Sequence, residues 1–107
     1  MVYLIKVYKF LMAIQTFAKL ELKEFFDTGK MPRKAKWQGV KKIVIRKLDM
    51  LNYAYVLDDL KSPPGNHLEA LGKDLKGSHS IRVNDQWRIV FEWTEQGPSQ
   101  VRIMDYH

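Results

Sequence analysis

The alternation of apolar and polar residues is most regular over positions 80–91, where it predicts a β-hairpin. Every second residue of the two limbs is apolar: Ile81, Val83, Trp87, Ile89 and Phe91. Successive side chains of a strand point to opposite faces of a sheet, so this period of two predicts one buried and one exposed face. Between the limbs, Asn84-Asp85 tolerates the positive φ that a short hairpin connection uses.

The other face of this hairpin carries two arginines, Arg82 and Arg88, near the middle of the predicted sheet. We expect both guanidinium groups to be exposed there. A guanidinium presents a planar set of N–H donors that matches a phosphate, and a strand holds that set in a fixed place. The hairpin therefore predicts a phosphate-binding face, provided that other residues complete it.

Two helices are predicted before the hairpin. The first spans Glu21–Thr28 and ends before Gly29, a residue type that favours helix C-termini. Leu22, Phe25 and Phe26 lie three and four residues apart and form its apolar face. The second helix is predicted over Arg33–Ala54, because an apolar stripe recurs there at spacings of three and four residues. The members of this stripe are Trp37, Val40, Val44, Leu48 and Leu51.

Further strands are predicted on either side of these elements. Ala13–Phe17 is predicted as a first strand, His67–Leu71 as a strand before the hairpin, and Val101–Tyr106 as the last strand. Ser62–Asn66 and Glu95–Ser99 combine Pro, Gly and Ser and predict breaks between elements. Strands grouped apart from helices define an α+β fold, here with two helices packed on one face of a small antiparallel sheet.

Length and charge narrow the class of protein. The chain has 107 residues, which fits one domain, and it has no cysteine, which excludes disulfides and thiolate metal sites. Its formal net charge is +6 at pH 7, and positions 30–47 hold eight lysine or arginine residues and no acidic residue. Such clustering favours an anionic partner, most often a nucleic acid. Four lysines are expected on the helix face opposite the apolar stripe, either solvated or in contact with RNA: Lys34, Lys41, Lys42 and Lys47.

The first eleven residues are apolar but are interrupted by Lys6 and Lys9. The run is too short and too charged for a membrane span, and no small-residue cleavage site of a secretory signal follows it. Two interpretations remain, an additional β segment or an extension that the fold does not need. We favour an extension over residues 1–11, with Met12 as an alternative start and residues 12–107 as the domain.

Six residues with functional side chains are expected on or beside the sheet face away from the helices: Glu69, Arg82, Arg88, Asp105, Tyr106 and His107. The sequence has no metal-ligand spacing and no glycine-rich phosphate loop, so no cofactor is expected. This set suits metal-free RNA cleavage, which needs a base for the 2′-hydroxyl proton, a cation for the phosphorane charge and an acid for the leaving oxygen. A structural interpretation also exists for each residue, such as an ion pair within the sheet for Arg88.

At these residues the sequence resembles the HigB-type toxins of bacterial toxin–antitoxin modules, in the RelE/ParE superfamily. The resemblance covers about residues 13–107. It is carried by Ile-Gln-Thr-Phe (14–17), Leu-Lys-Glu-Phe-Phe-Asp-Thr-Gly (22–29), Lys-Gly (76–77), the hairpin over 80–91 and the terminal Asp-Tyr-His (105–107). The hairpin and the terminus together are quite specific, whereas either alone would be weak.

This resemblance implies a RelE-like fold and cleavage of mRNA on the translating bacterial ribosome, in the cytoplasm. It also implies neutralisation by a helix-turn-helix antitoxin of the HigA type. Asp105, Tyr106 and His107 match the family's C-terminal catalytic triplet, and Arg88 matches its strand arginine. His107 would then transfer a proton or stabilise the transition state, Arg88 would stabilise phosphate charge, and Tyr106 would stack on or orient the substrate.

The sequence departs from the family pattern at two places. Some members carry a histidine where this chain has Glu69, so the base is either Glu69 or a group at the terminus. Members usually carry Lys-Gly-Asp before the hairpin, whereas this chain has Gly72-Lys73-Asp74. Lys73 and Lys76 in this loop are candidate contacts to RNA or the ribosome.

Two other functions fit the same fold. One is a ParE-like inhibitor of DNA gyrase, which would need no acid–base set, and the Asp-Tyr-His terminus argues against it. The other is an inactive relic whose role is to bind its antitoxin. The leading interpretation is an mRNA endonuclease toxin.

Overall fold

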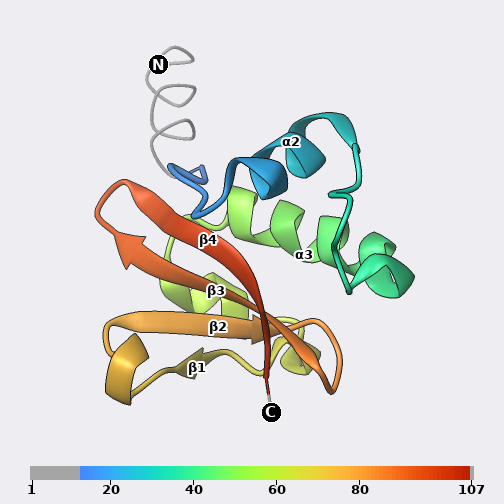
Figure 1. The fold of residues 1–107 in the computed structure, drawn as a ribbon. Coiled ribbons are helices and arrows are strands. Elements are labelled where there is room, and N and C mark those ends of the chain that lie inside the picture. The colour runs from blue at the N-terminus through green and yellow to red at the C-terminus, as the bar shows by residue number, and fades with distance from the viewer. Residues whose placement is uncertain (1–12, 107) are drawn as a thin grey trace.

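The computed structural model describes residues 13–106, in which two α-helices pack on one face of an antiparallel sheet (Figure 1). The helices are α2 (Leu20–Thr28) and α3 (Lys41–Tyr53), and the strands are β1 (Glu69–Ala70), β2 (Ser78–Arg82), β3 (Trp87–Thr94) and β4 (Gly97–Asp105). The strand order is β1-β2-β3-β4. The predicted α+β architecture is confirmed. The predicted extension, the alternative start at Met12 and His107 lie outside the described residues.

The core lies between the helices and the inner face of the sheet. Val44, Leu48 and Leu51 of α3 are fully buried in one cluster with Ile81 and Ile89 of the central strands. Burying one such side chain contributes about 1.5–3 kcal/mol, so this stripe is what attaches α3 to the sheet.

The central hairpin forms with the predicted alternation. Ile81 pairs with Ile89, and Arg82 pairs with Arg88, across β2 and β3. Residues that are directly opposite in an antiparallel pair share a face. The two isoleucines therefore face the core and the two arginines face the other side of the sheet, as the sequence pattern predicts.

The turn of this hairpin differs from the prediction. Within the described chain, neither Asn84 nor Asp85 adopts a positive φ. Instead, Oδ1 of Asn84 accepts hydrogen bonds from the backbone N–H groups of Gln86 and Trp87, at 2.9 and 2.8 Å. The side chain replaces a backbone acceptor, as in an Asx turn, so the turn closes without a left-handed residue.

Helix α2 matches the predicted first helix to within one residue. Gly29 follows it with a φ of 82°, and its N–H donates to the Phe25 carbonyl at 2.8 Å. A residue without Cβ adopts this left-handed conformation at little cost and satisfies a carbonyl at the helix end.

The second helix is shorter than the predicted Arg33–Ala54. A 3₁₀ turn over Gln38–Val40 precedes α3, and residues 33–37 are not helical. Trp37 is buried in this loop, with its ring edge-to-face against Phe25 and the centroids 5.0 Å apart. The apolar stripe continues into the loop because Trp37 reaches the core from there. Periodicity alone does not distinguish a buried residue on a helix from a buried residue in a loop.

The predicted first strand, Ala13–Phe17, is reduced to an isolated parallel bridge between Phe17 and Val101 of β4. Hydrogen bonds from Gln15 N–H to the Pro98 carbonyl (2.8 Å) and from Ala18 N–H to the Val101 carbonyl (3.0 Å) hold the segment against β4. The chain then turns away to begin α2, which limits the length of the pairing.

Two other strand boundaries are corrected. Strand β1 is shorter than the predicted His67–Leu71, because His67 adopts a left-handed φ of 43° that a strand does not accommodate. Strand β4 begins at Gly97 rather than Val101, so the predicted break over Glu95–Ser99 is shorter than expected.

The prediction that Lys47 lies on the solvated face of the second helix is wrong. It is 6% exposed, and its ammonium group donates to Oδ1 of the fully buried Asn66. Burial lowers the pKa of Lys47, and the charges of Arg46 and Arg82 lower it further. The buried ammonium therefore ties α3 to the segment that precedes β1.

We expect Lys47→Met to lower the free energy of unfolding at pH 7 by about 1–3 kcal/mol, because it leaves Oδ1 of Asn66 buried without its donor. Between the lowered pKa of Lys47 and its ordinary value of 10.5, the unfolded chain binds more protons than the folded one. Wild-type stability should therefore rise with pH across this window, and the variant should lack that rise. Urea unfolding at a series of pH values measures both effects.

Lys42→Met is the matched control, because Lys42 lies on the same helix and is exposed. It should change the unfolding free energy by no more than about 0.5 kcal/mol. Equal stability and equal pH profiles for the Lys47 variant and the wild type would contradict the assigned role.

Candidate active site

The guanidinium of Arg88 is buried, which corrects the expectation that it lies exposed on the sheet. The residue is 5% exposed. Its Nε donates to Oγ of Ser80 at 2.7 Å, and its Nη2 donates to the backbone carbonyl of His67 and, at 3.4 Å, to that of Ser80. Strand β2 and the segment before β1 therefore fix two of the three guanidinium nitrogens.

A carboxylate and a phenol lie beside the third nitrogen. Nη1 of Arg88 is 3.9 Å from Oε1 of Glu69, and Cζ of Arg88 is 5.2 Å from the ring centroid of Tyr106. The Tyr106 hydroxyl donates to Oε2 of Glu69 at 3.2 Å. Aromatic faces attract cations at this distance, so Tyr106 and Glu69 together cover Arg88. The structure thus brings three of the predicted site residues into one cluster.

The Nη1 edge is the part of Arg88 that can reach a ligand. Within residues 13–106 this nitrogen makes no hydrogen bond, whereas Nε and Nη2 are both engaged. Its two neighbours are accessible: the Glu69 side chain is 44% exposed and Tyr106 is 48% exposed. An anion that reached Nη1 would lie next to the Glu69 carboxylate.

Arg82 does not join this cluster. It faces the same side of the sheet as Arg88, but its Nη2 forms a close ion pair with Asp85 in the hairpin turn. Asp85 is on the surface, so this pair is solvated and weak.

Asp105 and Tyr106 point to opposite faces of the sheet. Asp105 is opposite Trp87 in the register of β3 and β4, and Oδ2 of Asp105 accepts a hydrogen bond from Nε2 of Gln86 at 3.1 Å. Successive side chains alternate between faces, which places Tyr106 on the side of Arg88. The predicted triplet is therefore divided, and its last member, His107, lies outside the described residues.

Five of the six lysines predicted to contact RNA are exposed: Lys34, Lys41, Lys42, Lys73 and Lys76. Lys73 has a positive φ of 53° at the start of a 3₁₀ turn. The sixth, Lys47, is buried in its bond to Asn66 and cannot present its charge to a nucleic acid.

The sequence prediction missed two partners of Arg88. Ser80 shares the face of Arg82 by the period of two, so the sequence contained a signal for it. The other partner is the backbone carbonyl of His67, which lies 21 residues from Arg88 along the chain. Every residue has a backbone carbonyl, whatever its side chain, so nothing in the sequence indicated this contact.

Within residues 13–106, no group of three His, Asp or Glu side chains is arranged to hold a metal ion. A helix long and apolar enough to cross a membrane is likewise not found in this part of the chain.

Comparison with solved structures identifies the fold. Two structures of the YoeB–YefM toxin–antitoxin complex from Staphylococcus aureus match with a TM-score of 0.51 and 18% sequence identity. Each match covers 90% of this chain and 97% of the other. The arrangement of two helices on a four-stranded sheet is thus shared with a chain of this complex.

Sequence comparison identifies the family. The family model described as RelE-like toxin of type II toxin-antitoxin system HigB matches residues 15–107. Toxin HigB-1 of Vibrio cholerae serotype O1 is 39% identical over 74 residues, which are 69% of this chain and 77% of that protein. An uncharacterized protein of Haemophilus influenzae is 44% identical over 52 residues, which are 49% and 52% of the two chains. This chain therefore belongs to the HigB-like toxins of type II toxin–antitoxin systems.

We expect Ser80→Ala to destabilise the fold by about 1–3 kcal/mol, because it removes the acceptor of the buried Nε–H of Arg88. Ser78→Ala is the matched control, since Ser78 is a buried serine of the same strand whose hydroxyl makes no hydrogen bond within the described residues. Chemical denaturation measures both variants. Equal unfolding free energies for the two would show that Ser80 does not hold Arg88.

Proposed function

We propose that this toxin is a ribosome-dependent endoribonuclease, which cleaves mRNA through attack of a 2′-hydroxyl on the adjacent phosphate. The observation that carries the proposal is Nη1 of Arg88, which makes no hydrogen bond within residues 13–106 and lies 3.9 Å from the Glu69 carboxylate, beside the Tyr106 ring. Membership of the HigB-like family supports the same reaction, which the sequence resemblance also implies.

The reaction needs no group from outside the protein and RNA. The 2′-hydroxyl loses its proton to a base, its oxygen bonds to phosphorus, the bond from phosphorus to the 5′ oxygen breaks, and that oxygen takes up a proton. The products are a 2′,3′-cyclic phosphate and a 5′-hydroxyl. A fixed cation at the phosphate is the largest single contribution that such a site can make.

In this proposal the Arg88 cluster supplies three of these roles, and His107, which lies outside the described residues, supplies the fourth. Arg88 stabilises the charge that develops on the phosphate through Nη1, since its other nitrogens are bound to Ser80 and to the His67 carbonyl. Glu69 lies beside this position and accepts the 2′-hydroxyl proton. Tyr106 moves off the guanidinium and stacks on a base of the substrate, an interaction that tolerates any base. His107 donates the proton to the leaving oxygen.

The exposed lysines support the ribosome as the place of action. Cations on the surface bind the phosphate backbone of RNA without reading its sequence. The loop with Lys73 and Lys76 directly precedes β2, which holds Ser80 of the Arg88 cluster. Lys41 and Lys42 are also exposed, in the first turn of α3. Action on ribosomes places the protein in the cytoplasm.

We also propose a helix-turn-helix antitoxin of the HigA type as the partner of this toxin. The family supports this proposal, because its members are described as toxins of type II toxin–antitoxin systems. The structurally similar YoeB toxin from Staphylococcus aureus was solved in complex with YefM. Binding of an antitoxin would keep the toxin from the ribosome.

We expect Glu69→Gln to lower the rate of mRNA cleavage on purified ribosomes by about 100-fold or more, because it removes the base. The substitution keeps the size of the side chain, and the Tyr106 hydroxyl can still donate to the amide oxygen, so the fold should be unchanged. Primer extension on a reporter mRNA measures the rate.

Two further variants complete this experiment. Arg88→Ala should lose activity to a similar degree, and thermal unfolding shows whether it still folds. Glu92→Gln should cleave at the wild-type rate, since Glu92 is exposed on β3 outside the cluster. Full cleavage by Glu69→Gln would place the base elsewhere. Wild-type protein that leaves mRNA intact but blocks supercoiling by purified gyrase would overturn the nuclease assignment.

Substitution of a single 2′-hydroxyl tests the chemistry independently of the protein. An mRNA with a 2′-deoxynucleotide on the 5′ side of the cut should resist cleavage there and still be cut at unmodified sites. The cut ends should carry a 2′,3′-cyclic phosphate and a 5′-hydroxyl. Unchanged cleavage at the deoxynucleotide, or a 5′-phosphate on the product, would contradict attack by the 2′-hydroxyl.

A further inference from the structure

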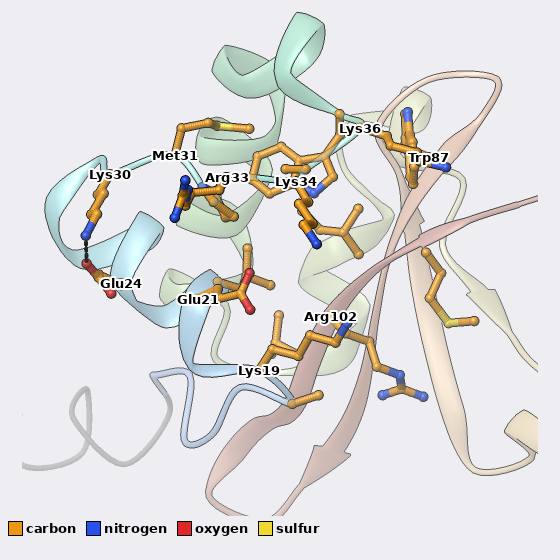
Figure 2. A pocket seen from close by; sticks show the side chains of 18 residues that line it. Lys19, Glu21, Glu24, Lys30, Met31, Arg33, Lys34, Lys36, Trp87 and Arg102 are labelled. Carbon is orange, nitrogen blue, oxygen red and sulfur yellow. Dashed lines mark ion pairs between the residues drawn. The ribbon is translucent and has the colours of Figure 1, made fainter.

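A cleft with a volume of about 1040 Å³ lies between α2, the loop over residues 30–37 and β4 (Figure 2). It is separate from the Arg88 cluster, because none of Arg88, Glu69, Ser80 and Tyr106 lines it. The reaction proposed above makes no use of this cleft.

The floor of the cleft is apolar. Four buried apolar residues line it: Leu22, Trp37, Trp87 and Val101. Burying a large apolar side chain on such a floor contributes about 1.5–3 kcal/mol. Nucleobases bind by stacking on open aromatic faces, but Trp37 and Trp87 are only 8% and 9% exposed. The floor therefore favours a protein segment.

The rim of the cleft is mostly cationic. Six cationic side chains line it: Lys19, Lys30, Arg33, Lys34, Lys36 and Arg102. Two carboxylates, Glu21 and Glu24, also line it, and Glu24 pairs with Lys30 at 3.3 Å. Within the described chain, Arg33, Lys34 and Lys36 are exposed and take part in no ion pair. In Figure 2, Lys19 at the start of α2 and Lys34 in the loop lie on opposite sides of the cleft. The surplus of positive charge matches an acidic partner.

The wall formed by β4 offers unpaired backbone groups. Val101 bonds outward to the segment before α2, through its N–H to Thr16 (3.1 Å) and its carbonyl to Ala18 (3.0 Å). By the period of two, the N–H and carbonyl of Ile103 also point outward from the sheet. At the level of Ile103, the segment that pairs with Val101 has already turned away to begin α2. Within residues 13–106, no backbone group therefore pairs with Ile103 on that side. Exposed strand edges of this kind accept an added strand.

We propose that this cleft receives an extended acidic segment of the antitoxin. The segment bonds to the backbone of β4 at Ile103, places an apolar side chain on the floor and sets carboxylates against the rim. The identity of the partner rests on the proposed function, whereas the preference for an acidic, apolar peptide rests on the cleft alone. Occupation of the cleft also covers Lys34, one of the cations proposed to contact the ribosome.

The probe is a synthetic ten-residue peptide of alternating Glu and Val, titrated against the full-length toxin. We expect saturable binding that weakens with salt, with NMR shifts at the Ile103 amide and the Trp87 indole. The double variant Arg33→Glu/Lys36→Glu should weaken binding by about tenfold or more. Lys61→Glu is the control, because Lys61 is exposed and lies outside the cleft.

Three outcomes would overturn the proposal: no binding of the acidic peptide, equal binding by the double variant and the control, or equal binding of a Lys-Val peptide. Tighter binding of a ten-nucleotide RNA, with shifts at the same cleft residues, would assign the surface to nucleic acid instead. The ribosome cleavage assay reports on the proposed function separately, because wild-type protein without nuclease activity would leave the peptide result unchanged.

Discussion

The burial of one positive charge constrains this structure more than any other interaction. A guanidinium removed from water must be paired or hydrogen-bonded, because an unsatisfied buried charge costs several kcal/mol. Arg88 meets this requirement with groups from three parts of the chain: the hydroxyl of Ser80, the carbonyl of His67, and the covering pair of Glu69 and Tyr106. The register of β1, β2 and β3 and the path of the C-terminal segment are therefore fixed together around one side chain.

The same constraint bears on the catalytic role proposed for Arg88. The bonds to Ser80 and His67 use Nε and Nη2, and they leave Nη1 beside Glu69, whose side chain is 44% exposed. A donor that is already oriented needs no reorganisation when charge develops on a substrate, which is the condition for efficient electrostatic stabilisation. In the proposed reaction Tyr106, which is 48% exposed, moves off the guanidinium when the phosphate binds, and Glu69 stays beside it. In the proposed reaction, one edge of the guanidinium holds the fold and another edge contacts the phosphate.

The sequence predicted those features that depend on local periodicity. The period of two in the hairpin predicted the pairing faces of β2 and β3, and the placement of Glu69, Arg88 and Tyr106 on one face followed from it. The burial of Arg88 could not be predicted, because its partners come from other elements and one of them is a backbone carbonyl. The second helix was predicted too long because Trp37 reaches the core from a loop. Lys47 lies three residues after Val44 and four before Leu51, so the helical spacing did indicate its buried position, and its charge alone led to the wrong prediction.

The most direct test of this account is the hydrogen exchange rate of the side-chain Nε–H of Arg88, measured by ¹⁵N NMR on the free protein. A proton held against Ser80 in a buried site exchanges only when the cluster opens. We expect exchange about tenfold or more slower than for the exposed Arg46, and faster exchange in Ser80→Ala. An Arg88 proton that exchanges as fast as that of Arg46 would show that the guanidinium is not fixed, and would contradict the site built around it.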